Sequence, residues 1–213
     1  MSKSSRTIKN MTMKKTLIIT ISLIFAMGMH AQNAEQARKI LDKTAATVSN
    51  KGGASASFTM NGKYGNTSGT INIKGNKFCA YTPQAIIWYD GKTQWTYNKS
   101  ADEVNVSTPT QAQQQSLNPY TFINLYKNGF NMSSKAVGGG SNQVHLTAQN
   151  QKSGIQEMYI TIDKNYHPTQ VKMRTSKGWS TISISNFKAK KLSDAAFKFN
   201  AKAYPNAEII DLR

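Results

Sequence analysis

The chain has 213 residues, with 27 Lys and Arg against 10 Asp and Glu, for a net charge of +17. That length suits one domain, or at most two small ones. The single Cys excludes an intramolecular disulfide framework, and with only three His it excludes a Cys/His zinc cluster. The charge would suit a nucleic-acid partner, so the compartment of the protein has to be established first.

The first 31 residues predict a secretory signal peptide. A basic stretch without acids leads into an apolar run at residues 17–27, and small residues follow up to Ala31. A transmembrane helix needs about 20 apolar residues, so this run is too short to span a membrane. We expect cleavage after Ala31, with Gly28 as the alternative, whichever of Met1, Met11 and Met13 is the start.

Removal of residues 1–31 leaves a mature chain with a net charge of +12. The only cysteine is Cys79, so none stands at the cleavage point to carry a lipid anchor. We therefore expect a soluble, monomeric protein in the periplasm. Genomic DNA is absent there and no nucleic-acid-binding motif is present, so no nucleic-acid partner is expected. The charge suits an anionic membrane surface, or it serves only solubility.

A helix is predicted at the start of the mature chain. Asn33 is a suitable N-cap and Gln36 its capping-box partner. Residues 50–53, rich in Gly, end the helix. One face has the helical spacing of a buried stripe, formed by Ala34, Ala37, Ile40, Leu41, Thr44, Ala45 and Val48.

Short strands are predicted after the helix, because the apolar period changes from about four to two. Each run is bounded by Gly, Asn, Asp or Pro, as in an antiparallel meander. Asp90-Gly91 predicts a hairpin turn between two aromatic-rich strands. The runs lie at residues 58–60, 71–73, 78–81, 86–89, 95–97, 104–106, 144–148, 155–162, 171–173, 180–187, 197–199 and 208–212.

Two short helices are predicted between the strand blocks. Thr108-Pro109 and Asn118-Pro119 each combine a cap with a first-turn proline, and the second helix reaches Gly129. No linker divides the chain, so residues 32–213 are expected to form a single domain. The predicted fold class is mainly β (α+β). It is an incomplete antiparallel β-barrel, or strongly curved sheet, covered by the N-terminal helix and a mid-chain helical lid.

Catalytic motifs are missing from the sequence. Nucleophile elbow, metalloprotease, P-loop and dinucleotide patterns do not occur. His145 and His167 are better explained as solvated or structural residues, and Cys79 as a small buried residue. We therefore predict no enzymatic activity, no metal and no cofactor.

Three segments resemble the family of LolA-type outer-membrane lipoprotein carriers. Residues 86–130, "IIWYDGKTQWTYNKSADEVNVSTPTQAQQQSLNPYTFINLYKNGF", contain a D-G-K-T hairpin, a V-x-V strand and the capped helix pair. The start "AEQARKILDKTAATVSNKGGASASFTMNGK" and the end "FKFNAKAYPNAEIIDL" are similar to the first helix and last strand of that family. The resemblance implies an incomplete barrel with a helical lid that holds lipoprotein acyl chains. It implies three partners: acylated lipoproteins, an inner-membrane ABC-type releasing complex and an outer-membrane acceptor.

Inward-facing apolar residues are the predicted site under this interpretation. The predicted acyl-chain cavity consists of Phe58, Met60, Ile71, Ile73, Phe78, Trp88, Trp95, Tyr97, Met158, Ile160, Met173, Ile182 and Ile184, and the lid contributes Phe122, Leu125 and Tyr126. One departure concerns an arginine that many members carry after the second strand, since Gly75-Asn76 stands there instead. Lid closure through that arginine is therefore not expected.

Two other functions fit the same sequence. The first is a periplasmic module that binds a lipid or an envelope protein without transferring it. The second is a hydrolase whose site matches no known motif.

Overall fold

The structure, a computed structural model, describes residues 32–49, 52–62, 65–110, 125–150 and 152–213. The predicted signal peptide and Phe122 lie outside these ranges. So does most of the predicted helix pair, of which residues 108–110 are irregular and only Leu125 is helical. Within the described residues, no helix combines the length and apolar character needed to cross a membrane.

Twelve strands account for most of the described chain. They are β1 (Ala54–Gly62), β2 (Gly65–Lys74), β3 (Lys77–Tyr81), β4 (Ala85–Tyr89), β5 (Gln94–Asn98), β6 (Glu103–Ser107), β7 (Phe130–Val137), β8 (Ser141–Ala148), β9 (Glu157–Ile162), β10 (Pro168–Thr175), β11 (Gly178–Ala189) and β12 (Glu208–Asp211).

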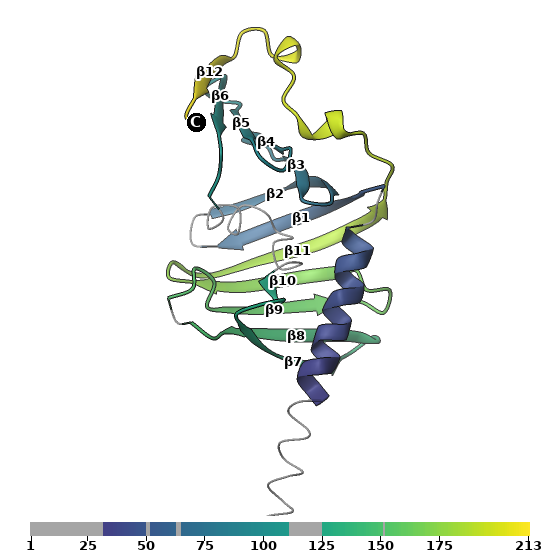
Figure 1. Cartoon of the computed structure of the whole chain (residues 1–213). Helices are drawn as coiled ribbons and strands as arrows, with labels where there is room; N and C mark the ends of the chain where they lie inside the picture. The colour runs from purple at the N-terminus through teal and green to yellow at the C-terminus, as the bar shows by residue number, and fades with distance from the viewer. Residues whose placement is uncertain (1–31, 50–51, 63–64, 111–124, 151) are drawn as a thin grey trace, which may run out of the picture.

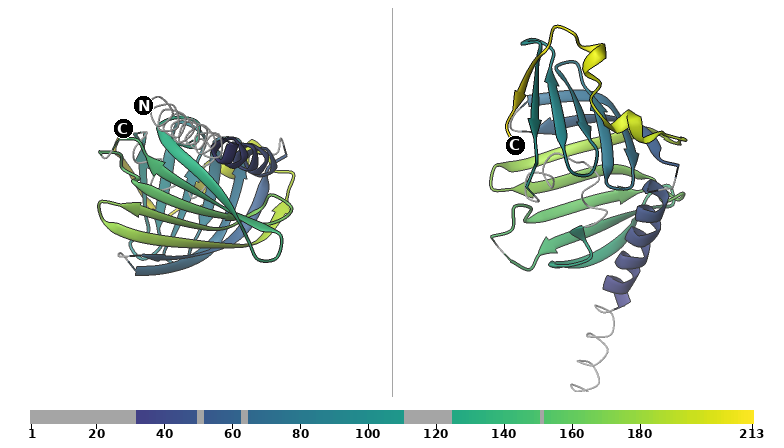
Figure 2. Two further views of the ribbon diagram at one scale, coloured as in Figure 1. Left: turned by 90° about the horizontal axis from the view of Figure 1, so that it is seen from below. Right: turned by 45° about the horizontal axis from the view of Figure 1, so that its top comes forward.

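All twelve strands form one sheet, in the order β12-β6-β5-β4-β3-β2-β1-β11-β10-β9-β8-β7. Neighbours are antiparallel except β12 and β6, which are parallel. The end strands β7 and β12 do not pair with each other, so the sheet stays open. It bends strongly, and β3–β6 stand at a steep angle to β7–β10 (Figures 1 and 2). The predicted curved, incomplete barrel is confirmed.

The hairpin between β4 and β5 shows how the local sequence sets the register. The Asp90 carboxylate accepts hydrogen bonds from the backbone N–H of Lys92 (3.0 Å) and Thr93 (2.8 Å). Gly91 has a φ of +101°, which a residue with a Cβ adopts only with strain. The turn therefore fixes Trp88 opposite Trp95 in the ladder.

The N-terminal helix, residues 32–48, lies against the inner side of the curved sheet (Figure 2). Its predicted stripe is buried: Ala37, Leu41, Thr44 and Val48 are at most 1% exposed. The predicted cap is wrong. The helix already includes residue 32, and the side-chain oxygen of Asn33 accepts from the backbone N–H of Ser134 (2.6 Å). Edge strand β7 has no further strand to bond, so Asn33 supplies the acceptor.

The segment after β11 was expected to continue as a strand through Phe197 and Phe199. Instead it forms two short 3-10 helices, η1 (Asp194–Phe197) and η2 (Ala201–Ala203). No strand lies beside it to accept a ladder. The segment packs by its rings, since Phe197 is fully buried and Phe199 lies 5.6 Å from Trp88, centroid to centroid.

Strand β7 is absent from the sequence prediction. Its sequence, FNMSSKAV, has only Phe130 and Met132 as large apolar residues, and Ser134 follows them on the same face. An edge strand that is partly covered by a helix needs little apolar alternation, so the period-two pattern is too weak to detect.

We expect Phe197→Ala to lower the free energy of unfolding by about 3–5 kcal/mol, because a fully buried ring is removed beneath the C-terminal segment. Chemical denaturation measures this change. Lys198→Ala, at the exposed neighbouring position, is the control and should leave stability nearly unchanged. Equal stability of both variants would mean that the C-terminal segment is not part of the fold.

Candidate functional site

The inner face of the sheet is a continuous apolar surface from β8 across β9, β10, β11, β1 and β2 to β3 and β4. Its buried members form one cluster with the apolar stripe of the N-terminal helix. On β5 this character ends, because Gln94 and Thr96 occupy the inward positions opposite Tyr89 and Ile87. The apolar inner surface therefore has a defined limit.

Nine of the thirteen residues predicted for the cavity belong to this inner cluster. They are Phe58, Ile71, Ile73, Phe78, Met158, Ile160, Met173, Ile182 and Ile184. Cross-strand pairing explains why they meet, since Ile71 and Ile73 pair with Ala80 and Phe78 on one side, and Ile160 and Met158 pair with Val171 and Met173 on the other. Of the predicted lid residues, Tyr126 is in the cluster and Leu125 packs against it.

Three predicted cavity residues lie on the opposite face of the sheet. Trp88, Trp95 and Tyr97 form a second cluster with Phe197, Phe199 and Tyr204 of the C-terminal segment. Strand β4 is apolar on both faces, as its sequence indicates, and the prediction assigned Trp88 to the inner one. Tyr89 and Ile87 face inward there instead, so the aromatic residues of β5 cover the outer side.

Met60 lies on the inner face of β1 but beyond the buried cluster, at the rim. It is 37% exposed. A pocket of ≈ 350 Å³ at this end of the sheet is lined by Met60, Gly62, Gly65, Asn66, Thr67, Gln84 and Ser180. Deeper on the same face, Phe58 lies opposite Gly69, where a Cβ would clash with the carbonyl oxygen of Tyr81 and crowd the Phe58 ring. Gly69 therefore makes room for that ring.

Polar contacts tie the N-terminal helix to the rest of the molecule at three places. Tyr126 donates its hydroxyl proton to the Asp42 carboxylate (2.5 Å), and the ammonium of Lys43 donates to the Tyr166 hydroxyl (3.0 Å). The third contact is the bond from the Ser134 backbone to Asn33. Burial, and then the bond to Asp42, raises the pKa of Tyr126, so its phenol stays a donor.

The place of the family arginine is the turn between β2 and β3. Lys74 and Lys77 flank Gly75-Asn76, and both pair with Asp194 of η1, at 2.9 and 3.0 Å. These cations hold the C-terminal segment rather than the helix. The Tyr126–Asp42 bond thus joins the helix to the end of the predicted lid without an arginine.

Nucleophilic chemistry has little support at the titratable residues. Cys79 is buried, and burial raises the pKa of its thiol to about 11, so it stays protonated at neutral pH. His145 lies 2.9 Å from Glu157 and His167 stacks on Phe187, both structural contacts. Across the described residues, no three His, Cys, Asp or Glu side chains are placed to hold a metal ion.

Comparison with known proteins agrees with this geometry. The sequence profile of the family described as "Outer membrane lipoprotein carrier protein LolA" matches residues 27–177. The chain belongs to the LolA family. Its members bind or carry other molecules. Curated protein sequences give no significant match.

Solved structures share the fold of this LolA-family chain at low sequence identity. An uncharacterized conserved protein from Thermus thermophilus superposes with a TM-score of 0.57 at 14% identity, over 83% of this chain and 99% of that one. The lipoprotein LppX of Mycobacterium tuberculosis gives 0.47 at 12% identity, over 75% and 98%. A LolA superfamily protein from Nitrosomonas europaea gives 0.44 at 11%, over 76% and 97%.

We expect Tyr126→Phe to lower the free energy of unfolding by about 1 kcal/mol, because the bond to the exposed Asp42 carboxylate is lost while the ring stays packed. Urea denaturation measures the loss. Asp42→Asn should cost a similar amount, and the double variant should cost little more than either single variant. Full additivity of the two losses would contradict a direct bond.

Proposed function

We propose that the protein is a periplasmic carrier that binds the acyl chains of lipoproteins on its inner face and transfers them from the inner to the outer membrane. The observation that carries this proposal is the continuous apolar inner face of an open sheet, from β8 to β4. LolA family membership supports an extracytoplasmic location and a binding role.

Acyl chains need a carrier because water excludes them. Each buried methylene contributes about 0.8 kcal/mol, so a protein with several acyl chains stays in its membrane unless another apolar surface replaces the bilayer. The inner face offers Ile, Met and Phe side chains from two blocks of strands. Met and Phe adapt to chains of varied shape, since thioether side chains repack readily.

Release has to be possible as well as binding. The N-terminal helix covers the inner face through small and medium side chains, among them Ala37, Leu41 and Val48, and through a few polar contacts at its periphery. Such a cover can shift without breaking the sheet. Its bonds to Tyr126 and Tyr166 would set how readily it does so.

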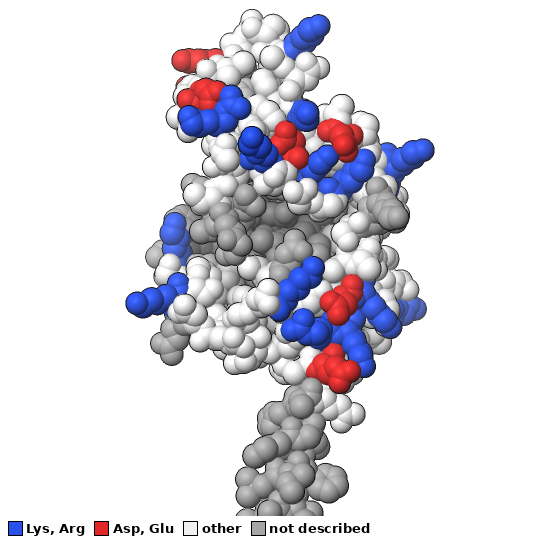
Figure 3. All heavy atoms as spheres, in the orientation of Figure 1, with Lys and Arg blue, Asp and Glu red and all other residues white. Residues whose placement is uncertain are grey.

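The charged surface is consistent with contact sites outside the inner face. In Figure 3, Lys, Arg, Asp and Glu gather over the N-terminal helix and over the upper part of the sheet. The proposed partners are acylated lipoproteins, an ABC-type releasing complex in the inner membrane and an acceptor at the outer membrane. A monomer suffices for this cycle.

We expect Met60→Glu to weaken binding of a fluorescent acyl probe about tenfold or more, because a carboxylate replaces an apolar side chain at the rim of the inner face. The matched control is Thr59→Glu, which places the same charge on the exposed outer face one residue earlier. Equal binding by the two variants would contradict the inner face as the site.

The decisive experiment is transfer of a lipoprotein. Inner-membrane vesicles that contain the releasing complex and a labelled lipoprotein are incubated with the protein, and the soluble lipoprotein complex is isolated. Addition of outer-membrane vesicles should then move the label to them. A module that binds without transfer would retain the label, and a chain that extracts no lipoprotein would contradict the proposal.

A further inference from the structure

The outer face of β8–β11 carries a row of aromatic rings that the core does not use. The Tyr159 ring stacks on His145 with centroids 4.3 Å apart and an interplanar angle of 2°. On the other side of Tyr159, the Trp179 ring lies at 6.0 Å. Trp179 is 39% exposed, so an indole stands at the surface without an apolar cover.

Two cations from β10 flank this indole. The Lys172 ammonium lies 4.7 Å from the centroid of the Trp179 ring, and the Arg174 guanidinium carbon lies at 5.9 Å. Exposed cation–π contacts are weak, so they orient these side chains and leave the positive charge at the surface. Among the described ion pairs, Lys172 takes part in none.

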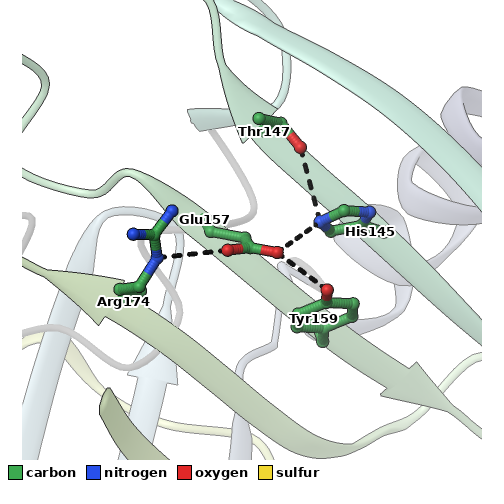
Figure 4. Close-up of polar contacts among 5 residues, drawn as sticks. All are labelled: His145, Thr147, Glu157, Tyr159 and Arg174. Atoms are coloured by element: carbon green, nitrogen blue, oxygen red, sulfur yellow. Dashed lines mark hydrogen bonds and ion pairs between the residues drawn. The ribbon is translucent and has the colours of Figure 1, made fainter. Parts of the chain in front are cut away.

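One carboxylate organises the polar part of the row (Figure 4). Glu157 accepts from the Tyr159 hydroxyl (2.7 Å) and from Arg174 Nε (3.1 Å), and it lies 2.9 Å from His145 Nε2. The Tyr159 bond, followed by the His145 bond, lowers the pKa of Glu157, so it is charged at neutral pH. Glu157 thus fixes the rings and Arg174 in place.

Charge is distributed unevenly between the two halves of the molecule. Residues 130–189, which contain β7–β11, hold seven Lys and Arg and only two acids, Glu157 and Asp163. The strand acids Glu103, Glu208 and Asp211 lie at the other end of the sheet, on β6 and β12. The β7–β11 half is therefore the positive side of the protein.

The aromatic row also lies close to the rim pocket. Trp179 follows directly after the turn between β10 and β11, and the next residue, Ser180, lines the pocket together with Met60. Consecutive strand residues point to opposite faces, so Trp179 faces outward where Ser180 faces inward.

We propose that the outer face of β8–β11, around Lys172, Arg174 and Trp179, docks on the anionic surface of a phospholipid bilayer. Indole side chains favour the headgroup region, where an apolar ring and a polar N–H are both satisfied. Lys and Arg beside it are attracted by lipid phosphates. This inference goes beyond the proposed function, because docking does not require that the inner face bind acyl chains.

Vesicle co-sedimentation tests the docking. The protein, purified in the form in which cells accumulate it, is mixed with vesicles of phosphatidylglycerol and phosphatidylethanolamine, or with vesicles of phosphatidylcholine alone. We expect binding to the anionic vesicles only, and loss of binding at high salt, because the attraction between exposed charges is screened.

The paired variants identify the surface. Lys172→Gln with Arg174→Gln should lower the vesicle partition coefficient about thirtyfold, since two cations near an anionic surface are lost. Trp179→Ala should lower it further. The charge-matched control, Lys198→Gln with Lys202→Gln on the C-terminal segment, should bind at least several times better than the β10 double variant. Far-UV circular dichroism and thermal unfolding verify that each variant is folded.

Three results would overturn the inference. They are equal binding by the β10 double variant and its charge-matched control, equal binding to neutral and anionic vesicles, and binding to a soluble polyanion such as heparin without binding to vesicles. The acyl-probe assay on the same variants separates the two proposals, because Lys172 and Arg174 lie outside the inner face and their loss should leave probe binding unchanged.

Discussion

A curved sheet that does not close has to cover its apolar concave side with something other than its own strands. This constraint shapes most of the molecule. The N-terminal helix supplies one cover, and its stripe of small and branched residues matches the Ile and Met side chains of β9–β11. Because the cover is a helix and not another strand, its backbone is satisfied internally, and it is held by side chains alone. Such a cover is separable from the sheet, which a closed barrel would not allow.

The second cluster solves the opposite problem at the other end of the sheet. Strands β3–β5 are apolar on their outer face too, and the C-terminal segment shields that face with Phe197, Phe199 and Tyr204. The ion pairs of Asp194 with Lys74 and Lys77 lie beside it and are part exposed, so packing of the rings contributes most of the stability there. The two faces thus carry separate tasks: the inner one offers a binding surface and the outer one completes the fold.

Local pattern was sufficient to predict most strands and the helix stripe, because both depend on apolar periods that the sequence displays directly. Strand β7 escaped because an edge strand under a helix needs little alternation. The face of Trp88 escaped for a different reason. In a strand with apolar residues on both sides, such as β4, periodicity cannot say which side is inner; only the C-terminal segment decides it, and that segment lies more than a hundred residues later. The bond between Tyr126 and Asp42 joins residues 84 apart in sequence, so spacing gives no signal for it.

The parallel pairing of β12 with β6 has a consequence for the order of assembly. Strands β1 to β6 succeed one another along the chain and can pair as they appear, whereas β6 keeps an open edge until the last residues arrive. An open edge invites pairing with another chain. The final residues, Glu208–Asp211, therefore act as a molecular seal that is applied last, and any extension fused behind Arg213 is placed next to that seam.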